Sequence, residues 1–155
     1  MTEMTGPEAG GGASGLRLAH IGIAVADLSD ARERFAALLG STPSPVEEIA
    51  SEGVRVSFFE LENCRLELLE STRPDSPIAK FLAAGRKGVH HLAFSTRDAD
   101  LSTLLESLRA RDVPLLDETP RRGAEGSEVI FVHPRGAEGV LVEFVDPDTD
   151  TRADR

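Results

Sequence analysis

A duplicated pattern of histidine and glutamate is the feature that most constrains the fold of this chain. In each copy, a strand-like run that carries a histidine is followed later by a strand-like run that carries a glutamate. The pairs are His20 with Glu67, 47 residues apart, and His91 with Glu143, 52 residues apart. In both copies an aspartate follows the histidine by seven residues. Two copies of one unit, folded about a pseudo-twofold axis, would place both histidines and both carboxylates at one centre.

The first copy reads as a strand, a helix and an antiparallel strand pair. Alternating apolar residues predict the strand over residues 16–25, and apolar residues then recur at helical spacing from Leu28 to Leu39. Asp27 or Ser29 can cap this helix, because a short side-chain oxygen accepts a hydrogen bond from a free backbone amide. The remaining predicted features are a left-handed stop at Gly40 and strands over residues 54–61 and 65–69.

The second copy repeats this order. We predict a strand over residues 89–95, followed by a helix that Asp98 caps. Four leucines form the buried stripe of that helix: Leu101, Leu104, Leu105 and Leu108. The chain then predicts a short extended stretch over residues 113–116 and a closing hairpin of residues 129–132 and 140–145. The repeat therefore reads β-α-β-β-β, twice.

A short helix joins the two copies and has no counterpart before the first. Ser76 is its predicted N-cap, Pro77 its first residue, and Gly85 lies past its end. We therefore expect an α+β fold of two βαβββ modules in tandem, related by a pseudo-twofold axis, whose curved sheets form a metal-binding cleft. The predicted segments are a disordered N-terminal tail, the first module, a linker helix, the second module and a C-terminal tail, over residues 1–15, 16–72, 73–87, 88–147 and 148–155.

Composition excludes several classes of function. The net charge of −10 and the absence of Trp and Tyr argue against binding of nucleic acid. No apolar run approaches the roughly 20 residues of a membrane span, and the first 15 residues lack the charged and apolar regions of a secretory signal. Cys64 is the only cysteine, so an internal disulfide is impossible and a reducing, cytoplasmic setting is expected.

The repeated residues predict a divalent-metal site. His20, Glu67, His91 and Glu143 would supply two imidazoles and two carboxylates, a mixed set that suits Co, Mn, Ni, Fe or Zn. Four protein ligands would leave two positions of an octahedral ion for a bidentate substrate. Taken singly, a strand histidine is usually a packing residue and a glutamate in an apolar run usually faces solvent. Their coincidence in both copies favours the metal site.

Two further histidines lie close to this pattern. His90 precedes His91, and in a regular strand its side chain would point to the opposite face. We therefore interpret His90 as a packing residue or a neighbour of the ligands. His133 lies in a turn-rich loop and is interpreted as structural or close to substrate.

Specific phrases of the sequence resemble a known family. In chain order they are H-I-G-I-A-V from His20, S-P-I-A-K-F-L from Ser76, G-V-H-H-L-A-F from Gly88, F-V-H-P-R-G from Phe131 and G-V-L-V-E-F-V from Gly139. They closely resemble the methylmalonyl-CoA epimerase family, of the vicinal-oxygen-chelate (glyoxalase-like) superfamily. The resemblance runs from about residue 18 to residue 147, nearly the whole of the expected folded part.

The resemblance implies an activity, a cofactor and an assembly. It makes His20, Glu67, His91 and Glu143 the ligands of a divalent metal ion. It implies that methylmalonyl-CoA is inverted at C2 between its 2R and 2S forms, through an enolate that the ion stabilises, with Glu143 as one acid/base. It also implies a homodimer. The identity of the native metal, the tolerance for other 2-alkylmalonyl-CoA esters and the pathway stay open.

The chain departs from the family pattern at the second acid/base. Some relatives carry a glutamate three residues after the glycine of a G-V-x-E phrase, where this chain has Val56. Glu52 and Glu60 lie nearby, and we interpret each as a solvent-facing charge. Coenzyme A also needs local positive charge for its phosphates, and Lys80 and Arg135 are the predicted substrate contacts. Arg135 replaces the lysine usual in the family, and its guanidinium can bind phosphate with two hydrogen bonds.

Three alternatives share this fold class. A glyoxalase-type isomerase would use similar ligands on a glutathione hemithioacetal. An extradiol dioxygenase would use two histidines and one carboxylate on iron, but such sites often add a tyrosine, and this chain has none. A small-molecule binding or resistance protein typically lacks the ligands. Metal content separates the binding protein from the enzymes, and substrate profile separates the enzymes from one another.

Overall fold

One mixed sheet forms the body of the protein. The computed structural model describes residues 15–96 and 100–146. Within this part, eight strands pair in the order β2-β3-β4-β1-β5-β8-β7-β6. They are β1 (Leu16–Ala24), β2 (Glu47–Ile49), β3 (Val54–Glu60), β4 (Arg65–Ser71), β5 (Gly88–Thr96), β6 (Arg121–Arg122), β7 (Glu128–Val132) and β8 (Val142–Asp146). The helices are α1 (Leu28–Leu39), α2 (Pro77–Ala83) and α3 (Leu101–Ala110), with 3₁₀ turns at Ala124–Gly126 and Pro134–Gly136.

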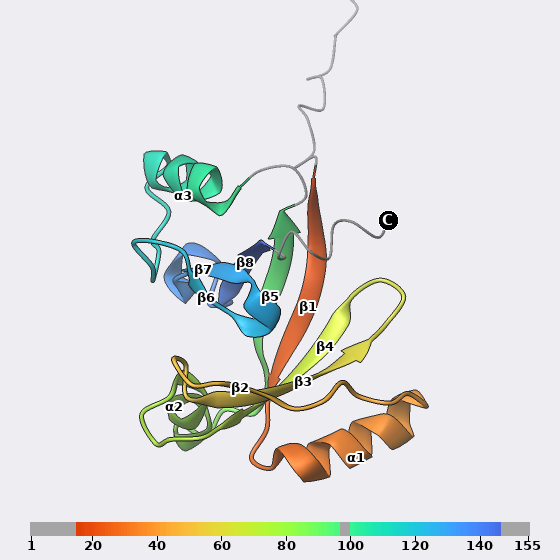
Figure 1. Cartoon of the computed structure of the whole chain (residues 1–155). Helices are drawn as coiled ribbons and strands as arrows, with labels where there is room; N and C mark the ends of the chain where they lie inside the picture. The colour runs from red at the N-terminus through yellow and green to blue at the C-terminus, as the bar shows by residue number, and fades with distance from the viewer. Residues whose placement is uncertain (1–14, 97–99, 147–155) are drawn as a thin grey trace, which may run out of the picture.

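The strand pairing has the predicted internal symmetry. β1 and β5 run antiparallel at the centre of the sheet, and each has a parallel partner on its outer side, β4 for β1 and β8 for β5. Two antiparallel strands then complete each half. Figure 1 shows the sheet curling so that the two halves lie on either side of β1 and β5. The βαβββ repeat and the α+β class are therefore confirmed.

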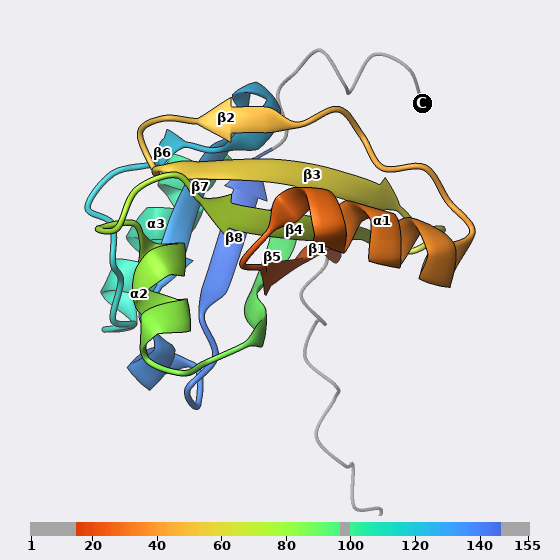
Figure 2. The same cartoon turned by 90° about the horizontal axis from the view of Figure 1, so that it is seen from below.

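Each half packs helices against its sheet. Of the two predicted caps of α1, the structure has Asp27, whose carboxylate accepts a hydrogen bond from the Asp30 amide, and Gly40 ends the helix with φ 63°. Its apolar face covers Phe59 and Leu68, both fully buried, and each such burial stabilises the fold by about 1.5–3 kcal/mol. Figure 2 shows α1 lying across β3 and β4.

The other two helices cover further apolar clusters. Ile78 and Phe81 of α2 pack in a cluster with Val54 and Val56 of β3. In the predicted leucine stripe of α3, Leu101, Leu105 and Leu108 are buried and Leu104 is partly buried, and the stripe packs against β7. No helix in the two described stretches is long and apolar enough to span a membrane.

The second half differs from the prediction in two places. The cap of α3 is Asp100, whose carboxylate accepts from the Thr103 amide; Asp98 lies outside the described residues. The predicted extended stretch at residues 113–116 pairs with β7 through one antiparallel bridge, from Leu115 to Val132, and does not lengthen into a strand, because Pro114 has no amide to donate. The outer strand is instead β6. The predicted tails fall almost wholly on residues 1–14 and 147–155, which are also outside the described part.

Candidate metal site

The four residues singled out by the repeat converge on one buried point. His20 lies on β1, Glu67 on β4, His91 on β5 and Glu143 on β8, so the four central strands each contribute one side chain. Their exposed fractions are 8%, 4%, 3% and 5%. Four ionisable groups buried together are costly unless they satisfy one another or hold an ion.

Short distances join these groups. The Nε2 atoms of His20 and His91 lie 3.0 Å apart. Glu67 Oε2 lies 3.3 Å from each of them. Glu143 Oε2 lies 3.0 Å from His91 Nε2 and 3.6 Å from His20 Nε2. Both imidazoles therefore aim the same ring nitrogen at both carboxylates.

The electrostatics of the cluster follow from this pairing. Burial disfavours a charged imidazole, but hydrogen bonds to Glu143 and Glu67 outweigh it and raise the pKa of His20 to about 10 and that of His91 to about 9. Burial likewise disfavours the carboxylates, but hydrogen bonds from both histidines lower the pKa of Glu67, and lower that of Glu143 to about 2. Positive charge between the two carboxylates is thus strongly favoured.

The donor set fits a divalent cation in place of the protons. The nitrogen and oxygen donors of His20, Glu67 and His91 lie within 4.8 Å of one another, and Glu143 approaches both imidazoles. Two carboxylates would balance a charge of +2, and the neutral imidazoles would add nitrogen ligands that suit borderline ions. The cluster can therefore bind a metal, and it contains no thiolate that would favour a closed structural zinc site.

The absence of a side chain at Gly22 makes room for this cluster. Gly22 on β1 is the cross-strand partner of His91 on β5. A Cβ atom at Gly22 would lie 2.6 Å from His91 Nε2, and closer still to two other atoms of the ring. Only a residue without a side chain leaves the His91 ring where it stands.

Two phenylalanines, which the sequence reasoning missed, enclose the histidines symmetrically. Phe58 on β3 meets the His20 ring edge-on, and Phe131 on β7 meets the His91 ring in the same way, both at 6.0 Å between centroids. Phe58 is the cross-strand partner of Glu67, and Phe131 that of Glu143. The repeat held a signal for them, because each phenylalanine lies opposite a predicted ligand in its hairpin.

An arginine lies over the ring of each of these phenylalanines. The guanidinium of Arg65 lies 3.9 Å from the centroid of Phe58, and that of Arg121 lies 4.9 Å from the centroid of Phe131. Such cation–π contacts stabilise by about 0.5–2 kcal/mol each. Each of the two histidines thus contacts an aromatic ring that an arginine also contacts.

A loop of the second half forms hydrogen bonds to the first half. Glu125, in the 3₁₀ turn Ala124–Gly126, accepts two hydrogen bonds from Arg65 at 2.7 and 3.0 Å. Its backbone amide donates to both carboxylate oxygens of Glu47 on β2, at 3.1 Å. These contacts tie the two modules together next to Phe58, so the halves of the site keep a fixed relation.

The remaining predicted residues differ in their exposure. Lys80 on α2 and Arg135 in the turn Pro134–Gly136 are exposed. Val56 is fully buried in the apolar group that α2 covers. Its hydrocarbon side chain cannot transfer a proton. Glu60 is 72% exposed and pairs with Arg65, as expected of a surface charge. The side chain of Glu52 is 23% exposed and pairs with Arg121.

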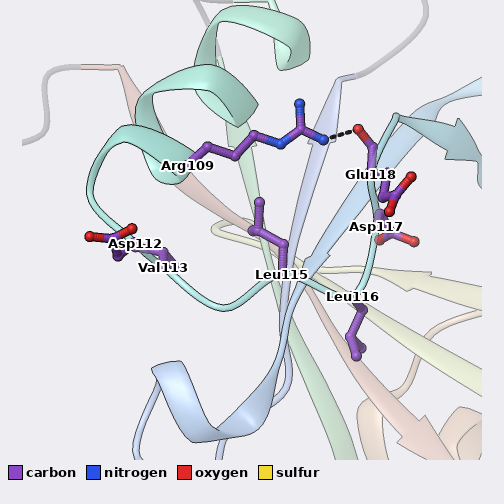
Figure 3. A pocket seen from close by; sticks show the side chains of 7 residues that line it. All are labelled: Arg109, Asp112, Val113, Leu115, Leu116, Asp117 and Glu118. Atoms are coloured by element: carbon purple, nitrogen blue, oxygen red, sulfur yellow. Dashed lines mark hydrogen bonds between the residues drawn. The ribbon is translucent and has the colours of Figure 1, made fainter.

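A surface pocket lies elsewhere, between the end of α3 and residues 112–118. Its volume is about 450 Å³, and none of the four clustered residues is among those that line it. Figure 3 shows Arg109 reaching across it to donate to the carbonyl oxygen of Glu118. Apolar lining is confined to three residues, Val113, Leu115 and Leu116. The imidazoles and carboxylates that could bind a metal are gathered in the buried cluster and not in this pocket.

Comparison with known proteins agrees with this geometry. Residues 19–131 match the Glyoxalase/Bleomycin resistance protein/Dioxygenase superfamily, so the fold and the site define a vicinal-oxygen-chelate protein. Human mitochondrial methylmalonyl-CoA epimerase is 37% identical over 129 residues, covering 83% of this chain and 72% of that protein. The ethylmalonyl-CoA/methylmalonyl-CoA epimerase of Cereibacter sphaeroides is 34% identical over 130 residues, covering 83% and 96%.

A solved structure gives the same result. A methylmalonyl-CoA epimerase in complex with methylmalonyl-CoA and NH4+ matches with a TM-score of 0.82 and 37% identity, covering 88% of this chain and 97% of that chain. Within the vicinal-oxygen-chelate superfamily, the chain belongs to the family of methylmalonyl-CoA epimerases, which are enzymes.

Proposed function

We propose that this protein catalyses the metal-dependent interconversion of (2R)- and (2S)-methylmalonyl-CoA. The observation that carries the proposal is the buried cluster of two imidazoles and two carboxylates, supplied symmetrically by the four central strands. Similarity to epimerases named for this substrate supports the choice of methylmalonyl-CoA.

The reaction needs a proton to leave and return at C2. This carbon lies between a thioester carbonyl and a carboxylate, so its proton is acidic enough to be removed by a positioned base. Inversion follows when the enolate is protonated on its opposite face. The four clustered side chains are buried, and electrostatic interactions strengthen where water is excluded.

Glu143 is the proposed proton acceptor. Its carboxylate is buried, and hydrogen bonds from the two imidazoles, against the opposing effect of burial, lower its pKa to about 2. The side chain is therefore ionised at neutral pH, which is the form that accepts a proton. Val56 supplies no second acid/base, so the opposite face of the substrate depends on another group.

His20, Glu67, His91 and Glu143 are the proposed ligands of the divalent ion, with Co, Mn, Ni and Zn as the candidates. When bound, such an ion would stabilise the negative charge that develops on the substrate oxygens. The ligands' contribution is to hold four donors close together in a buried site and to balance the charge of the ion.

Lys80 and Arg135 are the proposed contacts for coenzyme A. Both side chains are exposed and are therefore accessible to the phosphate groups of a ligand in solution. The protein carries a net charge of −10, so binding a polyanion requires local positive charge of this kind. We also propose that the protein is cytoplasmic and homodimeric; size-exclusion chromatography with light scattering tests the assembly.

Proton NMR in deuterated water tests the activity. The C2 proton signal of methylmalonyl-CoA is followed with the purified protein, after treatment with a chelator, and after addition of Co²⁺, Mn²⁺, Ni²⁺ or Zn²⁺. We expect the untreated protein to make the C2 proton signal disappear. The chelator should stop this loss of signal, and added metal should restore it. Ethylmalonyl-CoA is tested in parallel, since one relative is named for both esters. Absence of exchange with folded, metal-loaded protein would contradict the proposal and direct the search to glutathione hemithioacetals and catechols.

A further inference from the structure

A β-bulge directly precedes the His91 ligand. In the antiparallel pairing of β1 with β5, Gly22 lies opposite His91 and the next residue, Ile23, lies opposite Val89. His90 is therefore the extra residue of the bulge, without a partner on β1. A bulge interrupts the alternation of side chains between the two faces of a strand. It can thus bring the side chains of two consecutive residues to the same side.

The two consecutive histidines do meet. His90 Nδ1 lies 3.0 Å from His91 Nδ1, within hydrogen-bond distance. Both atoms are ring nitrogens, so in this hydrogen bond one of them carries the proton and the other accepts it. The opposite nitrogen of His91, Nε2, is the atom that faces His20, Glu67 and Glu143.

The proposed role of His91 decides which nitrogen donates. A neutral imidazole that binds a cation through Nε2 must offer the lone pair of that atom, so its one proton lies on Nδ1. His90 Nδ1 must then be the acceptor, and the proton of His90 lies on its own Nε2. Hydrogen bonds of this kind to the distal nitrogen orient metal-bound histidines in general.

We propose that His90 is a positioning residue that holds His91 in its Nδ1–H tautomer and fixes its ring orientation, so that Nε2 presents a lone pair to the divalent cation. The inference rests on the proposed metal site and deepens it. His90 does not touch the cation or the substrate in this assignment; it acts through His91.

The linker helix α2 holds His90 in turn. Phe81 of α2 meets the His90 ring edge-on, with centroids 4.9 Å apart and planes inclined by 80°. Arg86 caps the Phe81 ring at 4.4 Å from its centroid. The helix has no equivalent in the repeat, and this contact gives it a specific task at the site.

The first half of the repeat provides an internal contrast. A matching bulge lies on β1, where Leu18 pairs with Phe94 and His20 pairs with Ala93, so Ala19 is the extra residue. Ala19 precedes His20 as His90 precedes His91, but its methyl group cannot accept a hydrogen bond. The residue that precedes the ligand can therefore form such a hydrogen bond in the second half and not in the first.

Two substitutions separate hydrogen bonding from packing. His90→Asn keeps an acceptor near the place of Nδ1, whereas His90→Phe keeps an aromatic ring against Phe81 and removes the acceptor. We measure the affinity of each folded protein for Zn²⁺ and Co²⁺ by competition with a chromophoric chelator. We expect His90→Phe to lose about 10–100-fold in affinity, the usual effect of removing such a partner, and His90→Asn to recover most of it.

The tautomer of His90 is a second, independent readout. Nitrogen-15 NMR of the zinc-loaded wild-type protein should show the His90 proton on Nε2 and no proton on its Nδ1, the atom that accepts from His91. Affinity of His90→Phe equal to wild type, or a His90 proton on Nδ1 in the loaded protein, would overturn the role of His90 while leaving the metal site intact. If the wild-type protein binds neither ion, the proposed metal site itself is wrong and the role of His90 falls with it. Should His90→Phe fail to fold, the tautomer measurement still decides.

Discussion

Replacing Gly22 by alanine tests the geometry of the metal site directly. The new Cβ atom would lie 2.6 Å from His91 Nε2, where ordinary contacts begin near 3.4 Å. His91 cannot yield easily, because its ring is 3% exposed and is bounded by Phe131 and His90. The ring must therefore move by roughly an ångström or leave the cluster, and overpacking of this kind costs about 1–3 kcal/mol.

Both stability and metal binding should respond. For a chain of 155 residues, a loss of about 1–3 kcal/mol lowers the melting temperature by roughly 2–12 °C. Displacing a ligand should lower metal affinity at least as much as removing its hydrogen-bond partner, so we expect a loss of more than about 10–100-fold. Calorimetry of the metal-free protein and chelator competition measure the two effects.

Gly40→Ala is the matched control. A Cβ atom at Gly40 would meet nothing within 4 Å, but its φ of 63° makes a side chain strained, at a cost of about 1–2 kcal/mol. This control should lose stability and keep its metal affinity. Wild-type metal affinity in Gly22→Ala would refute the argument that the absence of a side chain at Gly22 makes room for His91.

Three further predictions follow from the site. Glu143→Gln should abolish exchange of the C2 proton while circular dichroism shows an unchanged fold; exchange at the wild-type rate would remove Glu143 from the mechanism. Raised pKa values for His20 and His91, about 10 and 9, stabilise the metal-free protein fully below the unfolded value of 6.5. Urea unfolding without metal should therefore show stability falling as pH rises from about 6.5 to 10, and a rise instead would contradict the pairing. Arg135→Ala should raise KM for the CoA ester with little change in kcat, and an unchanged KM would exclude the contact.

The two modules share a framework but not every detail. Each supplies one histidine, one glutamate and one phenylalanine in matching places. The arginines over the phenylalanines come from strands that do not match, Arg65 from β4 and Arg121 from β6. The modules also differ at the bulge, where Ala19 stands in the first and His90 in the second. The proposed substrate is itself unsymmetrical, with a thioester on one side of C2 and a carboxylate on the other. The two sides of the site could therefore bind the two different substituents of C2, although the four ligands are arranged symmetrically.

The sequence alone determined much of this protein. The start of α1 near Asp27 or Ser29, its end at Gly40 and the apolar stripe of α3 were predictable because they depend on residues a few positions apart. The four clustered residues were readable for a different reason. Duplication repeats the same residue types at nearly the same spacing, which a single occurrence of His20 or Glu67 would not have revealed.

Tertiary structure alone decided the contacts between strands. Which residue of β1 lies opposite which residue of β5 depends on register, and a bulge shifts that register by one residue without a mark in the local pattern. Strand alternation placed His90 on the face opposite His91, yet the bulge brings their rings together. The same holds for Gly22, whose missing side chain matters only because His91 lies across from it. Local sequence reports local energetics, whereas the shape of this site comes from residues about 70 positions apart that meet only when the two modules pair.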